Sequence, residues 1–337
     1  MDRRRLLAII LLALAIILII SVPVWLFTPL GANVLNPGQD DPPLTQLAYT
    51  PSPRVVPQAV LTPKGTPGVI SASGAILMDA DTGNILYEKN AETPALMAST
   101  TKIMTALLAL RAGTLDQMIT IGQDAIDQDG IGSTAGLYAG EQVSLKNLLY
   151  GLLLPSGDDA AVAIADGIAG SQNAFVNIMN AEAQRLHLFQ TRFFDPTGLD
   201  TDQNLNPIPA GQHYTTPYDL VRLAHYAMSI PLFAQIVGTK AYMPPANTTR
   251  GVQLPWKNTN TLLASFQGTV GIKTGWTGAA GGCLVFEAKR NGHTLLGVVL
   301  HSIGAQNTMV LDEQARAVDS TTLLTWGFRL PVQVPQV

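Results

Sequence analysis

Three short polar strings of this 337-residue chain carry side chains that could perform acyl transfer together. In the first string, Ser99 is the only serine with a lysine, Lys102, three positions later, and residues three apart share one face of a helix. Serine is a weak nucleophile until a base takes its proton, and a buried lysine can be that base. The apolar residues that follow predict that this helix start is buried and that Lys102 is desolvated; they are Ile103, Met104, Leu107 and Leu108. The spacing therefore indicates a serine nucleophile with a lysine base, although a capping serine beside a solvated lysine would give the same pattern.

The second string, Ser156-Gly157-Asp158, follows an apolar helical segment that ends at Leu154. Pro155 and Gly157 favour a tight loop, which could place a second hydroxyl beside the first serine. A polar pair after a helix is also common for structural reasons, so this string has little weight by itself.

The third string, Lys273-Thr274-Gly275, is predicted to end an edge strand and continues into Trp276. A lysine and a threonine at this place offer a cation and a hydroxyl to a carboxylate. Gly275 leaves room for a substrate backbone beside the strand. The string therefore predicts an anchor for a carboxylate-bearing substrate.

Strands are predicted at both ends of the region that carries these strings, with helices between them. A turn at residues 81–84 between two apolar runs predicts a hairpin, and Asn291-Gly292 predicts a second one. Helical patterns dominate residues 95–230, with Ser144 and Thr216 as predicted helix caps. The expected strands cover residues 73–79, 85–87, 269–273, 283–289 and 293–301, and a closing helix covers residues 311–326. This order predicts an α+β fold, an antiparallel sheet flanked by helices with an inserted helical lobe.

The three strings in this order resemble the Ser-x-x-Lys, Ser-Asp-Asn and Lys-Thr-Gly set of β-lactamases and penicillin-binding proteins. Between about residues 72 and 328 the chain looks most like the serine-type D-alanyl-D-alanine carboxypeptidase family of low-mass penicillin-binding proteins. The segments that carry this resemblance are residues 75–83, 86–90, 98–105, 154–161, 194–199, 258–260, 271–278 and 323–328. The resemblance implies a β-lactamase/transpeptidase-like fold and an enzyme that needs no metal and no cofactor.

By this resemblance, Ser99 attacks the carbonyl between the two terminal D-alanines of a peptidoglycan stem peptide. An acyl-enzyme forms, D-alanine leaves and water hydrolyses the ester; β-lactam antibiotics would acylate the same serine. The resemblance assigns Lys102 and Ser156 to catalysis, as base and proton relay. It assigns the substrate's terminal carboxylate to Lys273 and Thr274, and the oxyanion to the backbone N–H groups of Ser99 and Trp276.

Asp158 departs from the family pattern, which usually has asparagine at this position of the substrate-binding set. An asparagine can donate a hydrogen bond to a substrate carbonyl, whereas an ionised aspartate cannot. A carboxylate near Lys102 would also favour the charged form of the base. We therefore expect Asp158 either to be protonated or to turn toward another cation, with an altered pH optimum. An inactive site is the less favoured alternative, because the other residues of the set are intact.

The N-terminal region predicts export to the outside of a membrane. Residues 1–5 form a basic stub and residues 6–27 an uncharged apolar run long enough to cross a bilayer, which predicts a signal anchor with its N-terminus in the cytoplasm. A cleaved signal peptide, which would release the protein, is the alternative. Residues 28–68 are rich in proline and predict an extracytoplasmic linker, and residues 69–337 the catalytic domain. Many relatives carry a further C-terminal domain and membrane helix, so we expect the N-terminal run to serve as the anchor here.

Composition excludes several other functions. The net charge is −4 and argues against a nucleic-acid partner. A single cysteine, Cys283, lies in an apolar run and predicts a buried side chain, and the five histidines have no metal-binding spacing. The alternatives that stay open are a D,D-endopeptidase cutting peptidoglycan cross-links with the same residues and a non-catalytic cell-wall-binding homologue. A β-lactamase is less favoured because we find no Glu-x-x-x-Asn deacylation string.

Overall fold

The computed structural model describes residues 60–112, 114–202, 206–245, 254–305 and 308–333. The basic stub, the apolar run and most of the proline-rich segment lie outside these ranges, so their predicted structures stay predictions. In the described part no single helix is long and apolar enough to cross a bilayer; only the bent pair α8 (Pro217–Met228) and α9 (Pro231–Val237) passes such a test jointly.

A five-stranded antiparallel sheet forms the base of the fold, with strand order β3-β2-β10-β9-β8. The strands are β2 (Gly74–Asp79), β3 (Ile85–Lys89), β8 (Thr269–Thr277), β9 (Gly281–Arg290) and β10 (His293–Ser302). Strands from the two ends of the domain meet where β2 pairs with β10. At the predicted turn, Asn291 and Gly292 have φ values of 52° and 80°, as a two-residue hairpin turn requires. Both predicted hairpins and the antiparallel sheet are confirmed, and β8, which carries Lys273, lies at the sheet's edge.

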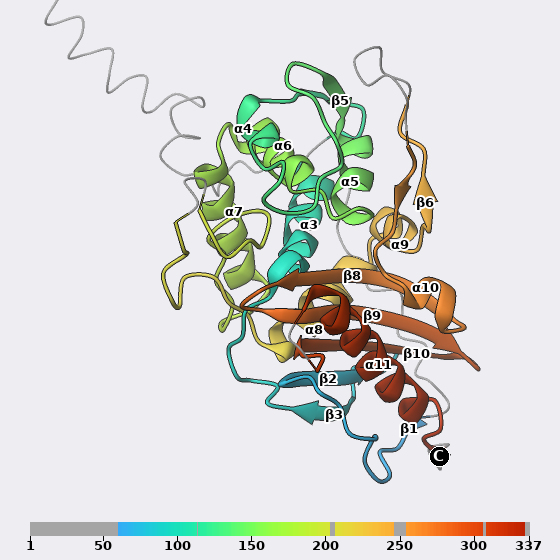
Figure 1. The fold of residues 1–337 in the computed structure, drawn as a ribbon. Coiled ribbons are helices and arrows are strands. Elements are labelled where there is room, and N and C mark those ends of the chain that lie inside the picture. The colour runs from blue at the N-terminus through green and yellow to red at the C-terminus, as the bar shows by residue number, and fades with distance from the viewer. Residues whose placement is uncertain (1–59, 113, 203–205, 246–253, 306–307, 334–337) are drawn as a thin grey trace, which may run out of the picture. The chain divides into compact units, whose positions relative to one another are not determined.

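The sheet separates two hydrophobic clusters, because successive side chains of a strand point to opposite faces. In β2, Ile76 and Met78 belong to the larger cluster and Leu77 to the smaller one. Helix α11 (Met309–Gly327) packs across β9 and β10 on the side of the smaller cluster, and α8 (Pro217–Met228) packs on β10 and β2 on the other side (Figure 1). The central strands are therefore buried on both faces, which explains their nearly continuous apolar sequences.

The inserted lobe is helical and stands beyond the β8 edge of the sheet (Figure 1). Its helices are η2 (Ala98–Thr101), α3 (Lys102–Ala112), α4 (Gln123–Ile126), α5 (Leu145–Leu153), α6 (Asp158–Ala169), α7 (Gln172–Arg185) and α9 (Pro231–Val237). The short helix α10 (Leu262–Ser265) packs on β8 instead, and its Leu262 belongs to the smaller cluster. Two small antiparallel pairs complete it, β4 (Met118–Thr120) with β5 (Gln142–Ser144), and β6 (Ala241–Tyr242) with β7 (Trp256–Lys257). Both predicted caps are present: Ser144 Oγ accepts from Asn147 N, and Thr216 Oγ1 accepts from Asp219 N.

Two expected boundaries differ in the structure. Lys273-Thr274-Gly275 lies inside β8, which runs on to Thr277, because β9 continues to pair with it as far as Gly281. The folded region also begins before residue 69, since β1 (Val60–Leu61) pairs with β11 (Val332–Gln333) and buries Leu61. Proline spacing marked residues 28–68 as a linker, but it could not reveal that the C-terminal strand holds the last part of that segment.

Candidate active site

The predicted nucleophile and base lie side by side where a short 3₁₀ turn becomes a helix. Ser99 is the second residue of η2, and Lys102 is the first residue of α3. The Nζ atom of Lys102 lies 2.8 Å from Ser99 Oγ. The Lys102 side chain is fully buried, whereas Ser99 is partly open and lines a cleft. The helical spacing therefore produces the contact that it predicted, and the amine is shielded from bulk water.

The backbone around Ser99 is held by two glycines that approach it closely. A Cβ on Gly198, whose φ is 91°, would lie 2.0 Å from the carbonyl oxygen of Ala98. A Cβ on Gly275 would lie 3.0 Å from both Ala98 Cβ and Ser99 N. Ala98 itself has a φ of 46°, a left-handed conformation that is costly for a residue with a side chain. The turn that contains Ser99 is thus packed tightly between β8 and the loop of residues 195–199.

Ser156 occupies the tight loop between α5 and α6, with a left-handed φ of 68°. Lys273 Nζ donates to Ser156 Oγ at 2.8 Å and to Thr274 O at 2.8 Å. Burial, together with the nearby charges of Lys102 and Arg316, lowers the pKa of Lys273 well below its usual value. Lys273 is 1% exposed and lies behind the cleft wall, so its contact with a substrate carboxylate stays a prediction. Its observed contact is with the predicted relay hydroxyl.

Asp158 begins helix α6 and points at the base. Its Oδ1 atom lies 2.5 Å from Lys102 Nζ, and both side chains are at most 1% exposed. Burial raises the pKa of Asp158, while the charge and hydrogen bond of Lys102 act in the opposite direction. Of the two expected arrangements, a turn toward a different cation is not what the described residues show. Asp158 pairs with the base itself.

The serines open into a cleft of about 550 Å³ between the sheet edge and the helical lobe. At one end Thr274 Oγ1 lies 2.6 Å from Thr259 Oγ1, and both residues line the cleft. Arg316 of α11 lines the same cleft; its Nη1 donates to Gly275 O at 2.7 Å, and its Nη2 pairs with Glu313. This end therefore presents hydroxyls and a guanidinium, groups suited to a carboxylate.

The sequence reasoning did not identify Thr259 or Arg316 as site residues. Thr259 lies within one of the segments that carried the family resemblance, so a threonine close to that motif was the available signal. Nothing in the spacing marked Arg316, because α11 reaches the cleft only through its packing on β9 and β8. Trp276 lines the cleft as well, and its side chain donates from Nε1 to Asp312 Oδ2 at 3.0 Å. The predicted oxyanion role of its backbone N–H stays a prediction.

A buried histidine, His213, is hydrogen-bonded to the 3₁₀ turn that carries Ser99. Phe194 N donates to His213 Nδ1 at 3.0 Å, so the other ring nitrogen carries the proton and donates to Thr101 Oγ1 at 2.9 Å. Thr101 in turn donates to Ala98 O at 2.8 Å. Burial lowers the pKa of His213, which keeps the ring in the neutral form that this chain of hydrogen bonds requires.

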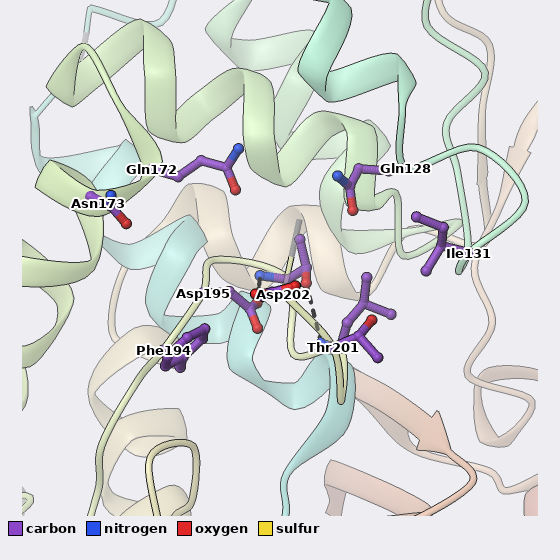
Figure 2. Close-up of a pocket in the computed structure, with 10 residues that line it drawn as sticks. Gln128, Ile131, Gln172, Asn173, Phe194, Asp195, Thr201 and Asp202 are labelled. Atoms are coloured by element: carbon purple, nitrogen blue, oxygen red, sulfur yellow. Dashed lines mark hydrogen bonds between the residues drawn. The ribbon is translucent and has the colours of Figure 1, made fainter. Parts of the chain in front are cut away.

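A smaller cavity of about 260 Å³ adjoins the cleft, and Ile131, Leu199 and Thr201 line both. Figure 2 shows the side chains of Gln128 and Gln172 facing the loop that carries Asp195. The smaller cavity is lined by amides, carboxylates and one aromatic ring, and it extends the cleft without contacting Arg316.

Comparison with known proteins agrees with this geometry. The D-alanyl-D-alanine carboxypeptidase family model matches residues 61–304. The chain is 39% identical over 278 residues to a D-alanyl-D-alanine carboxypeptidase of Streptomyces sp. strain K15, covering 79% of this chain and 90% of that protein. This chain belongs to the D-alanyl-D-alanine carboxypeptidase family. A D-alanyl-D-alanine endopeptidase of Pseudomonas aeruginosa is 30% identical, over 76% of this chain and 77% of its own length.

The fold of the family is shared as well. The crystal structure of the Streptomyces K15 DD-transpeptidase superimposes with a TM-score of 0.70 at 38% identity, covering 79% of this chain and all of that one. The predicted β-lactamase/transpeptidase-like fold is therefore confirmed. As a member of this family the chain is a serine-type peptidase, and the family resemblance drawn from the three strings is confirmed.

Proposed function

We propose that this member of the family removes the terminal D-alanine from peptidoglycan stem peptides, with Ser99 as nucleophile and Lys102 as its base. The observation that carries this proposal is the 2.8 Å contact between Lys102 Nζ and Ser99 Oγ at the wall of a 550 Å³ cleft. Ser99 Oγ bonds to the carbonyl carbon while its proton passes to Lys102. The developing oxyanion is held by the backbone N–H groups of Ser99 and Trp276.

The leaving end of the substrate lies toward Thr274, Thr259 and Arg316, whose hydroxyls and guanidinium bind its carboxylate. Ser156, held by Lys273, delivers a proton to the departing amine. The C–N bond breaks, D-alanine leaves, and water hydrolyses the ester at Ser99. Because a β-lactam ring presents a reactive carbonyl and a carboxylate in one small molecule, the same groups accept penicillins as acylating inhibitors.

Two measurements test this function. Incubation with a D-Ala-D-Ala-terminated pentapeptide should release free D-alanine, and incubation with penicillin should add the mass of one drug molecule to the peptide that contains Ser99. Ser99→Ala should abolish both. A Ser99→Ala protein that still released D-alanine at the normal rate would refute the assignment.

The carboxypeptidase is preferred to an endopeptidase because the chain is more similar to the carboxypeptidase of strain K15 than to the endopeptidase of P. aeruginosa. A cross-linked peptide dimer separates the two activities. The proposal requires that D-alanine release from the pentapeptide be much faster than cleavage of the dimer.

We also propose that residues 6–27 anchor the enzyme in the cell membrane, with the N-terminus in the cytoplasm and the catalytic domain outside. The support is the uncharged apolar run behind three arginines, followed by a proline-rich tether. The full chain should fractionate with membranes and expose its catalytic domain to protease added from outside. A chain that starts at residue 28 should not. Recovery of the full chain in the soluble exported fraction would indicate cleavage instead.

A further inference from the structure

The carboxyl group of Asp158 and the amine of Lys102 form a pair that is almost completely buried. Oδ1 lies 2.5 Å from Nζ, and the side chains are 1% and 0% exposed. The other charged groups that act on Asp158 are the carboxyls of Asp195 and Asp159, and Asp158 in turn acts on Lys273 of β8. Among the described residues, Lys102 is its one ion-pair partner.

The surroundings of the Lys102 amine suit a neutral base. Nζ has three polar neighbours: Asp158 Oδ1, Thr197 O at 2.8 Å and Ser99 Oγ at 2.8 Å. The first two can accept N–H bonds. A charged amine would use its third N–H on Ser99 and keep no lone pair to receive the serine proton. A neutral amine donates its two N–H groups to Asp158 and Thr197 and points its lone pair at the Ser99 hydroxyl.

The second oxygen of Asp158 offers a place for the proton that Lys102 must give up. Oδ2 has no hydrogen-bond partner among the described residues, and Asp158 lines the cleft. A Cβ on Gly132 would lie 2.1 Å from this oxygen, so the backbone of the cleft loop passes close to it while both residues line the cleft. Burial favours the protonated carboxyl at this position. With a proton on Oδ2, Oδ1 still accepts from Lys102, and Oδ2–H can donate to a carbonyl of the bound peptide.

We propose that Lys102 and Asp158 share a single proton, and that acylation starts from the form in which Lys102 is neutral and Asp158 carries the proton on Oδ2. The proposal rests on the function proposed above. One proton leaves Nζ for the carboxyl oxygen that it contacts, and a half-turn of the carboxyl group carries this proton to the Oδ2 position, which gives an uncharged amine and an uncharged acid. The Ser99 proton then passes to Nζ as the Oγ–C bond forms and the carbonyl electron pair moves to oxygen. No proton needs to leave the site for solvent.

A shared proton gives a definite pH signature. In the fully protonated state, an acid at position 158 and an amide at the same position are both neutral and equal in shape. At low pH the fraction of active enzyme, with neutral Lys102, is therefore the same in the wild type and in Asp158→Asn. At higher pH part of the wild type stays as the ion pair, whereas Asp158→Asn becomes fully active. The variant should thus have a higher plateau, and its acid limb should lie at higher pH.

The two differences are linked quantitatively. If only a fraction f of the wild-type pair has the neutral form, the plateau of Asp158→Asn is higher by the factor 1/f, and its acid limb shifts by the logarithm of that factor. A plateau about tenfold higher goes with a shift of about one pH unit. The wild type also loses the carboxyl proton at high pH, which gives an alkaline limb that Asp158→Asn lacks.

The test is the second-order rate of Ser99 acylation by penicillin in the full chain, between about pH 4 and about pH 10. Asp166→Asn is the matched control, because it removes a titrating carboxyl of the same helix that does not line the cleft. We expect this control to reproduce the wild-type profile. A protonated-carboxyl band in the infrared spectrum of the wild type, absent from Asp158→Asn, is an independent readout of the proton on Asp158.

Identical profiles for the wild type and Asp158→Asn would overturn the proposal, and so would a changed plateau without the matching shift of the limb. A folded Asp158→Asn protein, checked by thermal unfolding, is the condition for either reading. If it does not fold, the wild-type profile decides, because a wild-type profile without the alkaline limb would overturn the proposal. Persistent acylation of Ser99→Ala would instead refute the proposed function. The two failures are therefore distinguishable.

Discussion

Ser156 combines a strained backbone with a hydroxyl that the proposed mechanism needs, and two substitutions separate these properties. Ser156→Ala and Ser156→Gly both remove the hydroxyl. Only glycine tolerates the left-handed φ of 68° without a Cβ clash. Both variants therefore lack the hydroxyl, but only Ser156→Ala keeps the backbone strain.

The expected stabilities follow from the contacts. Removing the hydroxyl deprives the buried amine of Lys273 of one of its two acceptors, which costs about 1–3 kcal/mol. Alanine keeps the strain of the left-handed backbone, about 1–2 kcal/mol, which the wild-type serine also carries. Glycine removes this strain but loses about 0.5–1 kcal/mol through the greater freedom of its unfolded chain. We expect Ser156→Gly to be more stable than Ser156→Ala by about 0.5–1 kcal/mol.

The two variants should nevertheless be equally impaired in catalysis. Loss of a group that transfers a proton typically reduces rates about 10²–10⁴-fold. Urea unfolding measures the first quantity, and acylation by penicillin together with D-alanine release measures the second. If Ser156→Gly is no more stable than Ser156→Ala, the backbone there is not strained. If either variant acylates at the wild-type rate, Ser156 is not the relay.

Three further outcomes follow from the structure. Gly198→Ala places a Cβ 2.0 Å from the carbonyl oxygen of Ala98, at a φ of 91°. This variant should be less stable than the wild type by about 2–5 kcal/mol in urea unfolding, and penicillin should acylate it more slowly. Ser144→Ala removes the N-cap of α5 and should cost about 1 kcal/mol in urea unfolding while acylation stays unchanged. Burial and a hydrogen bond with Asp124 raise the pKa of Asp166 to about 7. In the unfolded chain this carboxyl ionises near its usual pKa of 3.8, so between that pH and about 7 only the unfolded chain loses the proton. The unfolding free energy of the wild type should therefore fall over this pH interval relative to that of Asp166→Asn. A difference that stays constant with pH would contradict this.

Much of the fold could be predicted because local pattern and tertiary structure agree. The apolar run of β2 predicted a buried strand, and Asn291-Gly292 fixed a hairpin turn through its own backbone preference. Ser144 and Thr216 capped the helices they were predicted to cap, since capping depends on a few neighbouring residues. The predicted end of the β8 strand was wrong because the length of β8 is set by its pairing with the next strand, β9, which continues as far as Thr277 and Gly281.

The sequence alone determined the chemistry that the site can contain: a serine three residues before a lysine, a second serine in a tight loop, and a lysine and threonine on an edge strand. A helix turn brings Ser99 and Lys102 together whatever surrounds them, so that contact could be predicted. The tertiary structure decided the remaining partners. Lys273 meets Ser156 across 117 residues of sequence, and Lys102 meets Asp158 across 56. A buried polar group bonds with whatever the packing of distant segments brings within reach, and no local spacing encodes that choice.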